Sequence, residues 1–169
     1  MKLENQNTSS LTHLGRLIDG LRVGMLTTVG AQGALRSRPM TTLKMDAEPA
    51  LWFLTSISSA KVNEMDQAGE VVLAYSDGRS DFVSVTGASQ LVRDRAVIEE
   101  LWTPLAKVWY PKGVEDADLA ALKIQIHLAE YWDGPDSKLE QLFVLAKVLL
   151  TGHVDDLGEN EKLGLRPDE

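Results

Sequence analysis

A run of hydroxyl side chains followed by a lysine is the part of this sequence whose residue types could act together chemically. Residues 55–59 read Thr-Ser-Ile-Ser-Ser, an apolar run precedes them at 51–54, and Lys61 follows two positions later. The pattern predicts a buried strand, a turn, and a helix capped by Ser58 or Ser59. Free helix N–H groups, hydroxyls and an ammonium group would together attract a phosphate monoester. Taken alone, the pattern more often marks a helix cap without a ligand.

Basic side chains gather around this run although the sequence as a whole is acidic. The 169 residues carry a formal net charge of -8, which argues against a general affinity for nucleic acid or for an anionic membrane. Residues 34–61 run against that trend. Their charged side chains are Arg36, Arg38, Lys44 and Lys61 against Asp46 and Glu48. A small basic cluster of this kind suits a small anionic ligand better than a polymer, and chance clustering is the alternative.

The sequence lacks the residues that several other kinds of chemistry require. The absence of cysteine excludes disulfides, thiolate metal sites and cysteine nucleophiles. His13, His127 and His153 are scattered, so no metal site is expected. There is no P-loop, GxGxxG or GxSxG motif, and no pair of carboxylates stands out as acid and base. The N-terminus lacks a secretory h-region and no apolar run reaches transmembrane length, so we expect a soluble, cytoplasmic protein.

The elements that must position the basic and hydroxyl residues are mostly short strands joined by hairpin signals. Strand patterns occupy 25–29, 34–43, 51–54, 71–75, 82–88 and 122–127, and helical patterns occupy 11–21, 60–68, 94–102 and 139–150. We therefore predict an α+β fold, mainly β, of about six antiparallel strands with flanking helices and a C-terminal helix. A small barrel would protect the edges of such short strands. We expect one domain at 1–152 and a polar tail at 153–169.

Two segments indicate contacts beyond the core. Along the strand at 34–43, Arg36, Arg38 and Met40 share one face, and Pro39 predicts an edge, a bulge or a ligand-facing position. Trp109 lies in a Trp-Tyr-Pro-Lys-Gly context and could cover a planar cofactor or form a dimer seam. The helix expected near 141–150 is apolar on more than one stripe, which favours a second subunit.

The order and spacing of these pieces resemble the pyridoxamine 5'-phosphate oxidase-like FMN-binding split-barrel family, and within it the general stress protein 26 group. The resembling pieces are Arg36–Met40, Leu51–Ser56 with Ser59 and Lys61, Tyr75 with Phe82–Gly87, Ile98–Trp102, Lys107–Pro111 and Glu130–Asp133. They cover roughly residues 10–150. The resemblance implies a homodimer of split barrels with one FMN in each of two grooves at the subunit interface.

The family's binding residues transfer onto the matching positions of this sequence. The resemblance implies that Arg38, Pro39 and Met40 line the flavin ring and ribityl chain. It also implies a phosphate site made of Thr55, Ser56, Ser59 and Lys61, reinforced by Arg36 or Arg38. The partner subunit's Trp109 would contact the ring.

Some positions depart from the family pattern. Ala60 stands where many relatives carry a second basic residue, and Glu99–Pro104 lacks the Tyr, Arg and Ser with which true pyridoxamine phosphate oxidases hold their substrate. The last strand ends Tyr131-Trp132-Asp133 without their Arg-x-His motif. We therefore expect a flavin-dependent oxidoreductase of the general stress type, with no catalytic residue assigned, rather than a true pyridoxamine phosphate oxidase. A non-enzymatic flavin-binding stress or sensor protein and a deazaflavin-dependent reductase are the alternatives.

Overall fold

The structure is a computed structural model that describes residues 1–134 and 159–165 of the chain. The helix expected at 139–150 lies outside these residues. The described strands are β1 (Lys2–Leu3), β2 (Val23–Val29), β3 (Leu35–Thr41), β4 (Lys44–Met45), β5 (Ala50–Ser56), β6 (Glu70–Ser76), β7 (Phe82–Val92), β8 (Leu119–Asp133) and β9 (Glu159–Gly164). The described helices are α1 (Ser9–Leu21), α2 (Ala60–Ala68) and α3 (Arg95–Leu101), with single 3₁₀ turns η1 (Ala31–Gly33), η2 (Pro104–Val108) and η3 (Gly113–Glu115).

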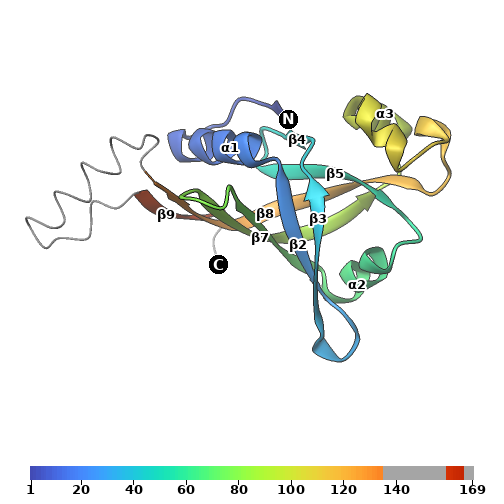
Figure 1. The fold of residues 1–169 in the computed structure, drawn as a ribbon, viewed down its shortest axis with the longest axis horizontal. Helices are drawn as coiled ribbons and strands as arrows, with labels where there is room; N and C mark the ends of the chain where they lie inside the picture. The colour runs from blue at the N-terminus through green and yellow to red at the C-terminus, as the bar shows by residue number, and fades with distance from the viewer. Residues whose placement is uncertain (135–158, 166–169) are drawn as a thin grey trace, which may run out of the picture.

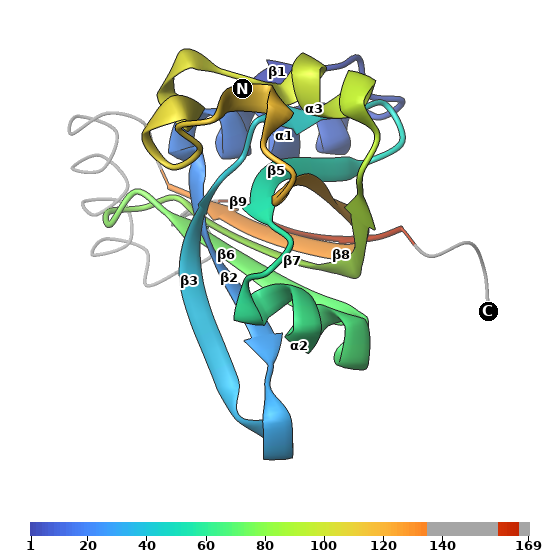
Figure 2. The same ribbon diagram turned by 90° about the vertical axis from the view of Figure 1, so that its right-hand side faces the viewer.

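One curled sheet organises the molecule. Its strand order is β1-β4-β5-β8-β7-β6-β2-β3, and β9 pairs with β8 beyond the end of β5. Every pair is antiparallel except β1 with β4. Figure 2 shows the strands curling between α3 at one end and α2 at the other. The predicted α+β class, mainly β, is confirmed, and the six predicted strands correspond to β2, β3, β5, β6, β7 and β8.

Three strands were not predicted from the sequence. β1 and β4 contain two residues each, which is too short for any alternation of side chains to be visible. The range 153–169 was expected to be a polar tail, whereas Glu159–Gly164 within it forms β9 and pairs with Leu128–Asp133 of β8. Backbone groups make this pairing, so a charged segment can supply an edge strand without an apolar pattern.

The two faces of the sheet differ in burial. Leu26, Leu73, Val85 and Ala129 lie side by side on neighbouring strands and are fully buried. Leu11, Leu14 and Ile18 of α1 belong to the same core, and Figure 1 shows α1 lying across the sheet. The opposite, outer face carries exposed apolar side chains. They are Val23, Met25, Val29, Leu35, Val72, Phe82, Leu128 and Trp132.

No helix among the described residues is long and apolar enough to cross a membrane.

Candidate functional site

A pocket of ≈ 490 Å³ lies between the end of β3, the end of β5, the start of α2 and the η2 turn. This volume falls within the range of about 300–1,000 Å³ that is typical of ligand pockets. Figure 2 shows the η2 turn beside the end of β3. The lining residues are Val23, Pro39, Met40, Thr41, Leu43, Leu54, Lys61, Thr103, Leu105, Ala106, Trp109 and Tyr110. The walls formed by the described residues are therefore mostly apolar and aromatic, and Lys61 is their one charged group.

Four of the residues singled out in the sequence lie together in this pocket. Pro39 and Met40 come from β3, Lys61 from the first turn of α2, and Trp109 from the end of η2. Trp109 was expected to reach the site from a partner subunit, and here it lines the pocket of its own chain. Trp109 is 66% exposed, so it is accessible to a ligand or to a second protein.

Lys61 is a charged residue of the pocket, and its surroundings shift the pKa of its side chain. Burial, and then the nearby charge of Arg38, lower the pKa of its ammonium group. Within the described part of the chain, no acidic side chain forms an ion pair with Lys61. A half-buried cation whose charged neighbour is another cation is stabilised by an anion between them. The site therefore attracts an anionic group at Lys61.

Arg36 and Arg38 both contact a residue that the sequence analysis did not select, Glu64 of α2. Arg36 Nη1 lies 3.0 Å from Glu64 Oε1, and Arg38 Nη2 lies 2.8 Å from Glu64 Oε2. Thr28 Oγ1 donates to Glu64 Oε2 at 2.5 Å and accepts from Arg38 Nη1 at 2.5 Å. The hydrogen bond from Thr28 and the contacts with both arginines hold the pKa of Glu64 below its usual value.

One spacing in the sequence could have directed attention to Glu64 before its contacts with the arginines were known. Glu64 follows Lys61 by one helical turn, so both side chains lie on the same side of α2. The partners of Glu64 on β2 and β3 could not be read from that spacing, because they are set by how the helix packs on the two strands.

The hydroxyl residues of the turn before α2 lie outside the pocket lining. Thr55 is fully buried, and its Oγ1 has no hydrogen-bond partner among the described residues. Ser59 lies at the N-cap position of α2, but its hydroxyl donates to the Ser56 carbonyl at 2.7 Å. A carboxylate from the start of β8 already binds this turn, because Asp118 accepts from Ser58 N and from Ser58 Oγ, both at 2.8 Å. The structure thus brings Lys61 to the pocket, uses the Ser58 and Ser59 hydroxyls in local contacts, and buries the Thr55 hydroxyl without a partner among the described residues.

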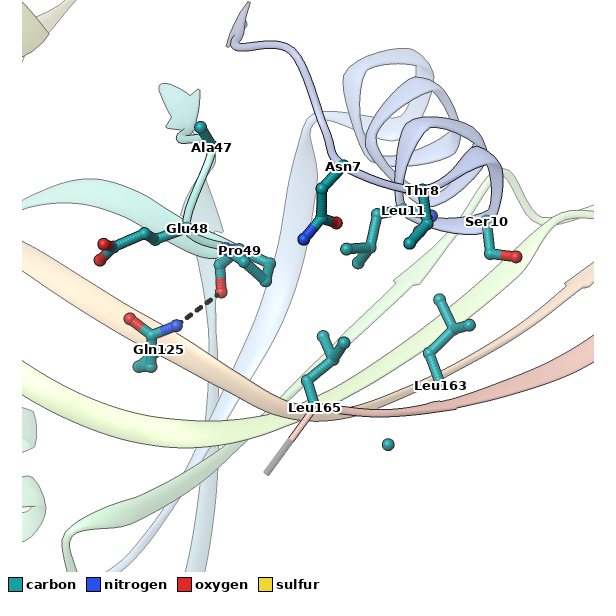
Figure 3. A pocket seen from close by; sticks show the side chains of 11 residues that line it. Asn7, Thr8, Ser10, Leu11, Ala47, Glu48, Pro49, Gln125, Leu163 and Leu165 are labelled. Atoms are coloured by element: carbon teal, nitrogen blue, oxygen red, sulfur yellow. Dashed lines mark hydrogen bonds between the residues drawn. The ribbon is translucent and has the colours of Figure 1, made fainter. Parts of the chain in front are cut away.

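A second pocket, of ≈ 600 Å³, lies between the start of α1, the 47–49 turn and β9. Figure 3 shows neutral polar side chains, apolar side chains and Glu48 around it, with the Gln125 amide donating to the Pro49 carbonyl at 3.2 Å. Among the lining residues that the structure describes, Glu48 is the only ionisable one. None of the residues selected from the sequence lines it, so the first pocket is the candidate site. Among the described residues, no group of side chains is arranged to hold a metal ion.

The family model described as pyridoxamine 5'-phosphate oxidase like matches residues 9–156 of this sequence. This chain belongs to the pyridoxamine 5'-phosphate oxidase-like family. The resemblance noted from the sequence is therefore confirmed at the level of the family. No match was found among proteins with curated functional descriptions.

Solved structures of general stress proteins share the fold of this family member. A protein from Jannaschia sp. CCS1, proposed to be a general stress protein 26, is 27% identical with a TM-score of 0.72, covering 93% of this chain and 99% of that chain. A proposed general stress family protein from Xanthomonas campestris pv. campestris is 32% identical with a TM-score of 0.60, covering 72% and 84%. The general stress FMN/FAD binding protein from Xanthomonas citri is 29% identical with a TM-score of 0.66, covering 77% and 93%.

Proposed function

We propose that this protein binds FMN in the pocket between β3, β5, α2 and η2, with the phosphate near Lys61 and Arg38. The observation that carries the proposal is the Lys61 ammonium group, which has no acidic partner within the described residues and lines an aromatic pocket. Membership of the family and the FMN/FAD binding of the Xanthomonas citri protein support it.

The residues present fit the chemical groups of FMN. Met40, Trp109 and Tyr110 offer apolar and aromatic surface, which suits a planar ring. Arg36, Arg38 and Lys61 provide three cations against the carboxylate of Glu64, so the phosphate end retains a positive excess. Thr55, Ser56 and Ser59 remain weaker candidates for phosphate contacts, because local hydrogen bonds or burial already occupy them.

We further propose a flavin-dependent oxidoreductase of the general stress type. Bound FMN would supply the electron-transfer chemistry, while the chain binds it, orients it and excludes water. No residue of the pocket is assigned as a general acid or base, and oxidation of pyridoxamine phosphate is not part of this proposal. A flavin carrier or sensor and a deazaflavin reductase are the outcomes that the experiment below separates.

We also propose that the protein is a homodimer whose interface includes the outer sheet face. That face is continuous with the pocket, because Val23 is one of its exposed residues and also lines the pocket. Pairing two such faces would bury the apolar side chains.

The test compares FMN with riboflavin, which lacks the phosphate. Replacing Lys61 by Met should weaken FMN binding by about 1.5–3 kcal/mol, the usual contribution of a charge-assisted contact, and leave riboflavin nearly unchanged. Lys107→Met is the matched control, because it removes the same charge from an exposed position beside the pocket without touching its lining. Equal losses of both ligands in the Lys61 variant would contradict the proposed phosphate site.

Two further readouts identify the cofactor and the activity. Absorbance and mass spectrometry of the small molecule released on denaturation distinguish FMN, FAD, a deazaflavin and no cofactor. Turnover of the loaded protein with NADH or NADPH distinguishes an enzyme from a carrier.

A further inference from the structure

We propose that Glu64 and Thr28 are positioning residues that hold the Arg38 guanidinium in place to bind the phosphate group of the flavin. The inference rests on the proposed function and adds to it two residues that lie outside the pocket lining.

The first support is a closed ring of hydrogen bonds among Arg38, Thr28 and Glu64. Arg38 Nη1 donates to Thr28 Oγ1 at 2.5 Å, Thr28 Oγ1 donates to Glu64 Oε2 at 2.5 Å, and Arg38 Nη2 donates to the same Oε2 at 2.8 Å. A guanidinium only donates and a carboxylate only accepts, so the threonine hydroxyl must accept from one and donate to the other. Two of the five donors of Arg38 are used in this way, and the hydrogen bonds among the described residues leave the other three for a ligand.

The second support is burial. Thr28 is 1% exposed and Glu64 is 7% exposed, whereas Arg38 keeps part of its side chain open to solvent. The ring therefore holds Arg38 from its buried side and leaves the other side free. Holding a long side chain in one rotamer before the ligand arrives reduces the entropy that binding must otherwise cost.

The third support is the place of Arg38 relative to Lys61 and to the pocket residues of β3. After burial, the charge of Arg38 is the second cause that lowers the pKa of Lys61, so an anion near both cations would be attracted by both. Arg38 also directly precedes Pro39 and Met40 on β3, and both line the pocket. A phosphate held between Lys61 and Arg38 would thus lie at the pocket wall.

Loss of the ring should matter more than loss of the negative charge of Glu64. Arg36 and Arg38 already neutralise that carboxylate at 3.0 Å and 2.8 Å, so its remaining repulsion of a phosphate is small. In Glu64→Gln, the amide oxygen can take the place of Oε2 only while the NH₂ group faces Arg36 Nη1, which is also a donor, and a neutral oxygen accepts more weakly than a carboxylate. The ring is therefore weakened. Thr28→Val removes the hydroxyl that accepts from Arg38 and donates to Glu64, and it keeps the shape of the side chain.

The experiment measures the ratio of FMN affinity to riboflavin affinity in the full chain. We expect Glu64→Gln and Thr28→Val each to lower this ratio by about tenfold, the effect of losing one hydrogen bond to a charged group, with riboflavin binding unchanged within about twofold. Thr28→Ser restores the hydroxyl and should restore the ratio. Adding Glu64→Gln to Arg38→Met should cause no further loss, because both changes remove the same interaction.

The outcomes separate this inference from the proposed function. A wild-type protein that binds no flavin, or binds FMN and riboflavin equally, would overturn the phosphate site itself. A wild-type preference for FMN that Glu64→Gln and Thr28→Val keep or increase would overturn only the positioning role. Riboflavin binding and thermal unfolding report whether each variant is folded, and Thr28→Val with its serine rescue decides the question if Glu64→Gln does not fold.

Discussion

The ring of Tyr75 packs directly against Gly24 of β2, next to the pocket residue Val23. A Cβ atom at Gly24 would lie 2.7 Å from two ring carbons of Tyr75. The ring is 2% exposed and its hydroxyl lies 2.8 Å from Thr42 Oγ1, so it has little freedom to move. We expect Gly24→Ala to lower the free energy of unfolding by about 1–3 kcal/mol, the usual cost of overpacking a core, as measured by denaturant titration.

Gly20→Ala is the matched control for Gly24→Ala. It lies in α1, and a Cβ atom there would meet no atom within 4 Å. Alanine favours a helix over glycine by up to about 1 kcal/mol, so Gly20→Ala should raise the free energy of unfolding. A Gly24→Ala variant as stable as the wild type would show that the Tyr75 ring can yield.

At the scale of elements, one carboxylate ties β9 to its neighbours. Glu161 Oε1 accepts from Ser10 Oγ of α1 at 2.8 Å, and Glu161 Oε2 accepts from the Tyr131 hydroxyl of β8. The hydrogen bonds from Tyr131 and Ser10, and the nearby His13, lower the pKa of Glu161. A group whose pKa is lowered by folding stabilises the folded state above its unfolded pKa, about 4.3 for Glu, and loses that contribution as the pH falls through the folded pKa.

This linkage predicts a pH-dependent attachment of β9. We expect Glu161→Gln at pH 7 to speed hydrogen exchange of the Leu165 amide, which donates to the His127 carbonyl at 2.7 Å, by about fivefold. The difference between the two proteins should shrink as the pH falls below the unfolded pKa of a glutamate, and it should vanish once Glu161 is protonated in the folded state. Lys162→Gln is the control on the same strand, since its exposed pair with Glu130 should contribute little. A difference that stays unchanged down to the pH of acid unfolding would contradict the role of the carboxylate.

At the scale of the whole molecule, the outer sheet face predicts the state of assembly. Specific interfaces bury about 1,200–2,000 Å² in total, and the exposed apolar side chains on five strands of the outer face would contribute to such an area. We expect a homodimer at micromolar concentration. The double variant Met25→Glu with Val72→Glu should be a folded monomer, because dimer formation would remove two carboxylates from water at the interface. Light scattering measures both.

Ser9→Glu is the control for assembly, because it adds a carboxylate to α1, which packs on the other side of the sheet. It should leave the dimer intact. A wild-type protein that is monomeric at micromolar concentration and still binds FMN tightly would contradict the proposed interface.

The sequence alone was sufficient for the six main strands and for a helix starting at Ala60, and its resemblance to the family selected Pro39, Met40, Lys61 and Trp109 as expected site residues. Alternation along a strand and the start of a helix are properties of neighbouring residues, so a local pattern records them. The four side chains do lie in one pocket, and their role in binding a flavin stays a prediction.

Only the tertiary structure decided what the charged groups contact. Arg38 meets Glu64, 26 residues away, and Asp118 binds Ser58, 60 residues away. The pairing of β9 with β8 joins Tyr131 to Glu161 in the same way. Such contacts depend on strand register and on how α2 packs against β2 and β3, because the energy of a charge is set by what surrounds it after folding. The arrangement of the arginines around a buried carboxylate is therefore a property of the folded chain.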